Sequence, residues 1–98
     1  METKPFVIIR TENAGCFAGY LASRSEDGEE ATLIDCIRLW YWSGAASLSQ
    51  LAAEGTSDPK NCKFPPAVKE HTMRSVLEII AVSDNAKISI QAVKPWRA

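Results

Sequence analysis

In the first part of the chain, the hydrophobic positions form three stretches. These stretches are rich in β-branched and aromatic residues, which is typical of strands. They cover residues 5–11, 16–24 and 31–42. The last two flank a polar tip with an Asp–Gly pair at residues 27–28, a strong signal for a tight hairpin turn. In the second stretch, Gly19 predicts a bulge or a close approach of two backbones. We expect an antiparallel meander.

The third stretch has apolar residues on both of its faces, because side chains alternate along a strand. One face carries Leu33, Ile37, Leu39 and Tyr41, with Asp35 among them, and the other carries Ile34, Cys36, Arg38, Trp40 and Trp42. This pattern indicates a central strand, covered on each side by a helix or by another copy of the protein.

After this stretch the spacing of apolar residues becomes helical. Ser47 is placed to cap a helix, Gln50 occupies the capping-box position three residues later, and Gly55 is placed to end it. The sequence therefore predicts a short helix over residues 47–55.

Residues 67–82 fit either a helix or a strand. The β-branched content of residues 76–82 favours a strand there. Ser83 or Asp84 can then cap a second short helix over residues 84–93.

These elements predict a single α+β domain over residues 1–98: a small twisted antiparallel β-sheet with two short helices. A chain of 98 residues has room for one hydrophobic core. Hydrophobic residues make up 46% and charged residues 23%, which is the composition of a folded globular domain.

The net charge of −1, from 11 basic and 12 acidic residues, argues against binding to duplex nucleic acid, which calls for a basic excess. A charge near zero also gives little repulsion between copies, so we expect a homo-oligomer.

Membrane, secretory and metal-binding functions have no signal in the sequence. No apolar run approaches the ~20 residues that span a bilayer, and the first ten residues lack the pattern of a secretory leader. The three cysteines are widely spaced and there is a single histidine, so we expect free thiols in a reducing cytoplasm, no metal and no cofactor.

Catalysis is not predicted either. A nucleophile needs a nearby base, and the only histidine, His71, lies beside Glu70 in a segment expected to be partly exposed. The acidic run at residues 26–30 is typical of a solvated turn. We expect a protein that is not an enzyme.

The aromatic stretch at residues 38–47 is the best candidate for a binding site. Its candidate ligand-binding residues are Arg38, Trp40, Trp42, Ser43, Gly44 and Ser47. In a purely structural interpretation, the two tryptophans instead pack under the 47–55 helix as core residues. In the other two interpretations this face binds either a partner protein or a nucleotide-type ligand.

In the nucleotide interpretation, base rings stack on indole and Arg38 pairs with phosphate. Ser43, Gly44 and the helix start at Ser47 then contact anionic oxygens. Trp42→Ala is expected to abolish ligand binding and to leave most of the fold. The remaining tryptophan, Trp96, is expected to dock onto its own domain or a neighbouring subunit rather than to form a free tail.

The order of four segments resembles a family of small uncharacterised proteins encoded by tailed bacteriophages and prophages. These segments are VIIRTENAGCFAGYLASR, RLWYWSGAASLSQLAAEGT, KFP and LEIIAVSDNAKISIQAVKPW. The resemblance implies an early or accessory phage product that acts in the host cytoplasm, with no assigned activity or site residues.

Phage proteins of this size tend to work by binding. We therefore expect a protein that sequesters a nucleotide-type signal of bacterial defence. The alternatives are a protein that binds and inhibits or redirects a host protein, and a minor virion or assembly protein.

Overall fold

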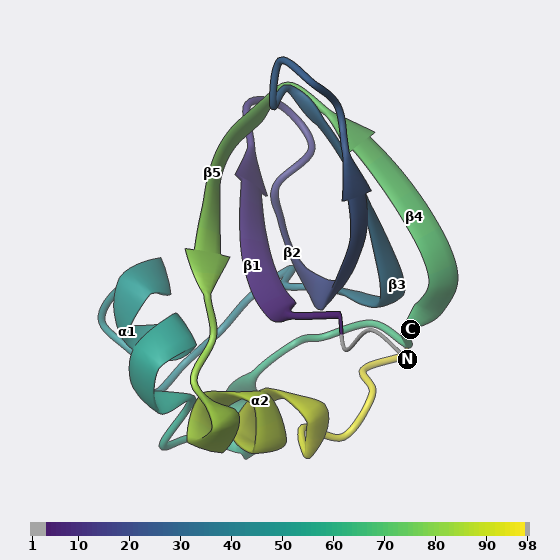
Figure 1. Cartoon of the computed structure of the whole chain (residues 1–98). Helices are drawn as coiled ribbons and strands as arrows, with labels where there is room; N and C mark the ends of the chain where they lie inside the picture. The colour runs from purple at the N-terminus through teal and green to yellow at the C-terminus, as the bar shows by residue number, and fades with distance from the viewer. Residues whose placement is uncertain (1–3, 98) are drawn as a thin grey trace.

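The computed structural model describes residues 4–97. The elements follow in chain order as β1 (Phe6–Thr11), β2 (Cys16–Arg24), β3 (Glu30–Arg38), α1 (Leu48–Glu54), a 3₁₀ turn (Pro59–Asn61), β4 (Val68–Arg74), β5 (Val76–Ala81) and α2 (Asp84–Gln91). The strands form one antiparallel sheet of order β4-β3-β2-β1-β5 (Figure 1). The predicted α+β class is confirmed.

The sheet curls until its two edge strands meet. β4 and β5 lie at opposite edges, yet only Ser75, with a φ of 57°, separates them along the chain. The Ser75 carbonyl accepts a hydrogen bond from the Glu12 amide, and the Val76 amide donates to the Glu29 carbonyl, both at 3.0 Å. These bonds tie the β1–β2 and β2–β3 turns to the junction, and the strands converge at this end of the molecule (Figure 1).

Two hydrophobic clusters lie on opposite faces of the curled sheet. The enclosed cluster takes its buried and partly buried side chains from all five strands and none from a helix; its buried members are Val7, Ile9, Phe17, Ala31, Leu33, Cys36 and Met73. The helix-side cluster joins the outer face of β1 and β2 to both helices and the 59–67 loop; its buried members are Phe6, Ile8, Ala18, Leu39, Leu51, Ala52, Cys62, Phe64, Ile90 and Val93. The curled sheet thus covers one of its own faces, where a helix or a second copy was expected.

A bulge in β3 changes the predicted faces of this strand. Ala18 pairs with Ile37 and Tyr20 with Ile34, so β3 contains one residue more than β2 between these pairs. Asp35 has a φ of 51° there, the positive value that a bulge residue can adopt. The strict alternation predicted for residues 31–42 is therefore wrong beyond Asp35.

The close backbone approach predicted at Gly19 is confirmed opposite this bulge. A Cβ atom at Gly19 would lie 3.0 Å from the Ile34 carbonyl oxygen and 3.1 Å from the Leu33 Cβ. A larger residue would push the two strands apart at this point.

The predicted helices and the strand over residues 76–82 are confirmed. The Ser47 hydroxyl accepts from the Gln50 amide at 3.1 Å, and α1 ends at Gly55, whose φ is 80°. Ser83 is the residue that caps α2. The ambiguous segment divides at Ser75 into β4 and β5. No helix within residues 4–97 has the length and apolar character needed to cross a bilayer.

Candidate functional site

The structure does not bring Arg38, Trp40 and Trp42 together on one face. β3 ends at Arg38, whose guanidinium lies 4.5 Å from the Phe17 ring centroid and donates to the Ala14 carbonyl at 2.7 Å. Trp42 packs, partly buried, against the helix-side cluster, whereas Trp40 is 59% exposed. The predicted common face is not formed because the chain leaves the sheet before it reaches the two tryptophans.

The predicted anion-contacting groups at Ser43, Gly44 and Ser47 have partners within the protein. The Ser43 hydroxyl donates to Asp58 Oδ2 at 2.9 Å, and the Gly44 carbonyl accepts from the Ser57 amide at 3.1 Å. The Ser47 hydroxyl is used as the α1 cap. These residues hold the 43–47 turn against the 56–58 loop.

Trp40 instead stacks on Trp96, far along the chain. The ring centroids are 5.4 Å apart and the planes are inclined by only 12°. The Lys63 ammonium lies 5.4 Å from the Trp40 centroid and 5.6 Å from the Trp96 centroid. Both distances lie within the ~6 Å range of a cation–π attraction, so the ammonium stabilises the aromatic pair.

Backbone hydrogen bonds from three segments hold this arrangement in place. Tyr41 and Lys63 form an isolated antiparallel bridge, in which the Lys63 amide donates to the Tyr41 carbonyl at 2.7 Å. The Trp96 amide donates to the Phe64 carbonyl at 2.9 Å. The predicted docking of Trp96 onto its own domain is confirmed.

A depression of about 510 Å³ adjoins Trp96. It is lined by Pro59, Lys60, Cys62, Lys94, Pro95, Trp96 and Arg97. We call the two tryptophans and the four surrounding cations the tryptophan patch: Trp40, Lys60, Lys63, Lys94, Trp96 and Arg97. All six side chains are exposed.

The four cations of the tryptophan patch have no ion-pair partner within the part of the chain that the structure describes. The ion pairs found there are Arg10–Glu78 and Arg74–Glu30. The charge of Lys60 acts on Asp58, where hydrogen bonds from Asn61 and Ser43, together with this charge, hold the pKa below its ordinary value of 3.8. The patch is therefore positive although the chain as a whole carries −1.

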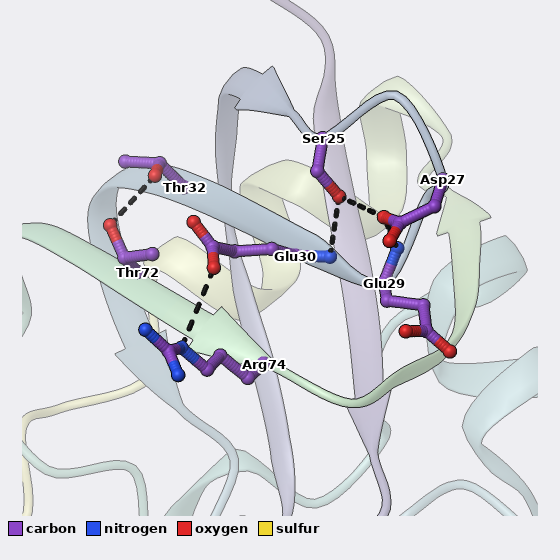
Figure 2. Close-up of polar contacts among 7 residues, drawn as sticks. All are labelled: Ser25, Asp27, Glu29, Glu30, Thr32, Thr72 and Arg74. Carbon is purple, nitrogen blue, oxygen red and sulfur yellow. Dashed lines mark hydrogen bonds and ion pairs between the residues drawn. The ribbon is translucent and has the colours of Figure 1, made fainter.

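A further polar cluster lies at the strand junction; we call it the hairpin rim and define it as Ser25, Asp27, Glu29, Glu30 and Arg74 (Figure 2). Its polar groups satisfy one another: the Ser25 hydroxyl donates to Asp27 Oδ1 at 2.6 Å and accepts from the Glu30 amide at 2.9 Å. Arg74 Nε lies 3.5 Å from Glu30 Oε2. This network fastens the β2–β3 hairpin to β4 and offers no free cation.

The structure groups no three metal-ligating side chains among residues 4–97. His71, the only histidine, packs on Phe17 with 4.8 Å between the ring centroids. Burial raises the pKa of the Cys36 thiol to about 12, so at neutral pH this group is a protonated core residue.

Sequence reasoning named Trp40 as a candidate and expected Trp96 to dock, but it missed that the two tryptophans meet. It also missed Lys60 and Lys63 as site residues. Their only sequence signal is two lysines in a proline-containing loop, which is common in solvated loops.

The fold and the patch together define a small α+β protein with an exposed surface of aromatic rings and cations. Residues 4–90 match the family model described as Domain of unknown function (DUF6948), and the chain belongs to this family. Neither curated proteins nor solved structures gave a match. The family match ends before residues 94–97, which contribute Lys94, Trp96 and Arg97 to the patch.

Proposed function

We propose that this protein is a non-catalytic binding protein that holds a nucleotide-type ligand on the tryptophan patch. The observation that carries the proposal is an exposed indole, Trp96, at the wall of a depression also lined by three cations that have no ion-pair partner among residues 4–97. Stacking of a base on an aromatic side chain contributes about 1–3 kcal/mol, and lysine and arginine bind phosphate oxygens.

The ligand ring stacks on an outer face of the aromatic pair and not between the two indoles. Ring atoms in contact are about 3.5 Å apart, so a ring inserted between Trp40 and Trp96 would need roughly 7 Å. Their centroids are only 5.4 Å apart. Because Trp96 lines the depression together with Lys94 and Arg97, we place the ligand ring on Trp96.

The side chains around the depression support binding without chemistry. They comprise prolines, cations, an indole and Cys62, with no carboxylate or imidazole that could act as a general base. Cys62 is 95% buried, and its thiol donates a hydrogen bond to the Ser43 carbonyl at 3.5 Å.

The biological setting of the proposal is the cytoplasm of an infected bacterium. The resemblance to proteins of tailed bacteriophages and prophages supports an accessory phage product that sequesters a nucleotide signal of bacterial defence. A sequestering protein returns its ligand unaltered, so ligand recovered after denaturation should be chemically intact. The homo-oligomer expected from the low net charge stays a prediction, which light scattering checks.

The direct test is calorimetric titration of the full chain with a panel of linear and cyclic nucleotides, repeated with Trp96→Ala. We expect saturable binding to the native protein and about a 5- to 150-fold loss in the variant, which corresponds to the loss of one stacked base. Trp42→Phe is the matched control, since it keeps a ring in the helix-side cluster and leaves the patch intact. Absence of binding across the whole panel, or full binding by Trp96→Ala, would contradict the proposal.

Binding to a host protein is the second candidate function. Trp40 and Tyr41 are 59% and 49% exposed, and tryptophan and tyrosine are enriched in the residues that dominate protein interfaces. Tyr41→Ala distinguishes the two candidates, because Tyr41 does not line the depression. The substitution should weaken capture of a host protein and leave nucleotide titrations unchanged.

A further inference from the structure

The proposed nucleotide site carries a further inference about its ligand, which rests on that proposed function. We infer that the tryptophan patch selects its ligand by the number of phosphates and not by the base, so that its ligand class is the nucleoside polyphosphates.

Three positive charges line the depression together with Trp96. Lys60, Lys94 and Arg97 all line the depression, and all three are exposed. The fourth cation, Lys63, lies beside the two indoles and stabilises the aromatic pair. Three cations therefore remain for the anionic part of a ligand whose ring lies on Trp96.

Three other cations of the fold are engaged, whereas Lys4, Arg24 and Lys69 have no ion-pair partner among residues 4–97 but lie outside the depression. Arg10 pairs with Glu78 at 2.9 Å, Arg74 pairs with Glu30, and Arg38 donates to a backbone carbonyl. This contrast separates charges that hold the fold together from charges that face the depression without a carboxylate partner in residues 4–97.

The depression offers little with which to read the edge of a base. A selective base contact needs a side chain that pairs with donors and acceptors in a fixed pattern, as asparagine, glutamine or a carboxylate does. The lining holds none of these; its prolines and its indole present apolar surface, and its cations donate only. Stacking alone tolerates every base.

A single phosphate group cannot pair well with all three exposed cations at once. An exposed ion pair changes affinity by roughly 1.5- to 5-fold, so affinity should rise in steps as phosphates are added. The contribution of Lys60 should be the smallest of the three, because the Asp58 carboxylate shares its surroundings. Lys94 and Arg97 flank Trp96 in sequence and should contribute most.

The experiment is calorimetric titration of the full chain with adenosine, AMP, ADP and ATP, then with GTP, CTP and UTP, without divalent cations and at fixed ionic strength. We expect affinity to rise about 2- to 5-fold with each phosphate and to differ less than about 3-fold among the four triphosphates. Inorganic tripolyphosphate should bind more weakly than ATP by the stacking contribution.

Charge-removing variants sharpen the test. Lys94→Gln and Arg97→Gln should each flatten the rise from AMP to ATP, whereas the matched control Lys69→Gln, an exposed β4 lysine outside the depression, should not. Equal binding of AMP and ATP, or a preference above 10-fold for one base, overturns the inference and leaves the proposed nucleotide site standing. Tripolyphosphate binding as tight as ATP instead overturns the stacking proposal and supports recognition of phosphate number.

Discussion

The hairpin rim and the tryptophan patch are both polar surfaces, but they differ in whether their charged groups have partners within the protein. At the rim, Ser25, Asp27 and Glu30 are bonded to one another, and Arg74 is paired across strands (Figure 2). In the patch, Lys60, Lys94 and Arg97 surround a depression without an ion-pair partner in the described chain.

The difference separates charges that are paired within the fold from charges without an ion-pair partner among residues 4–97, which the proposed function assigns to a ligand. The polar groups of the rim are hydrogen-bonded or ion-paired with one another, and these contacts help to stabilise the fold. Unpaired cations of like sign repel one another and contribute nothing comparable to the fold, so their convergence beside an exposed indole favours a role in binding.

The largest effect should come from the loop that supports the patch. Gly44 has a φ of 82°, and a Cβ atom there would lie 2.6 Å from Thr56 Oγ1 and 2.7 Å from the Ser57 amide nitrogen. Gly44→Ala should therefore lower the free energy of unfolding by about 2–4 kcal/mol, from left-handed backbone strain and overpacking together, measured by urea denaturation.

Gly15→Ala is the control for this prediction, in the β1–β2 turn near the strand junction. Gly15 has a φ of 91°, but a Cβ atom there would meet nothing within 4 Å. The substitution should cost only the strain, about 1–2 kcal/mol. Equal losses of unfolding free energy in the two variants would show that the atoms around Gly44 move apart easily to accommodate a Cβ atom.

The second-largest effect is a difference in stability loss between substitutions of Trp42 and of Trp96. Trp42→Ala should lower the free energy of unfolding by about 2–3 kcal/mol, below the 3–5 kcal/mol of a fully buried aromatic residue, because Trp42 is only partly buried against the helix-side cluster. Trp96→Ala should cost less than Trp42→Ala, since Trp96 is 38% exposed and stacks on the exposed Trp40 rather than on the helix-side cluster. Chemical denaturation monitored by circular dichroism gives both values, and a larger loss for Trp96→Ala would reverse their assigned roles.

The smallest effect is a pH dependence to which Asp27 of the rim and Asp58, in the loop before Lys60, contribute. A hydrogen bond from the Ser25 hydroxyl, and then one from the Glu29 amide, lowers the pKa of Asp27. Hydrogen bonds from Asn61 and Ser43 lower the pKa of Asp58. A carboxyl group whose pKa is lower in the folded state stabilises the fold above its unfolded pKa of about 4 and loses that effect as the pH falls through the folded value.

Asp27→Asn and Asp58→Asn should therefore each reduce the loss of stability between pH 5 and pH 2. Urea midpoints at several pH values measure this slope. If neither variant changes it, the acid sensitivity of the fold resides in other carboxyl groups.

The sequence predicted the elements whose signals are local. The cap at Ser47, the stop at Gly55 and the Asp–Gly hairpin tip each act within a few residues, so α1 and the β2–β3 hairpin could be placed from the chain alone. The strand over residues 76–82 followed from β-branched content and became β5.

The bulge at Asp35 could not be predicted, because a non-glycine residue with positive φ leaves no periodic signal. It places Leu33 and Cys36 in the same enclosed cluster, which strict alternation forbids. The stack of Trp40 on Trp96 could not be predicted for a different reason. Periodicity indicates which residues share a face of one element, but it does not indicate which distant segments are in contact.

The pairing of β1 with β5 has a consequence for how the protein folds. The Arg10–Glu78 pair joins residues 68 positions apart, so closing the sheet requires a large loop to be ordered before its contacts form. Folding dominated by such distant pairings takes milliseconds to seconds in small domains, not microseconds. The tryptophan patch draws on segments around residues 40, 60 and 96, so a ribosome-bound chain in which residues 94–97 have not yet been added lacks the complete patch.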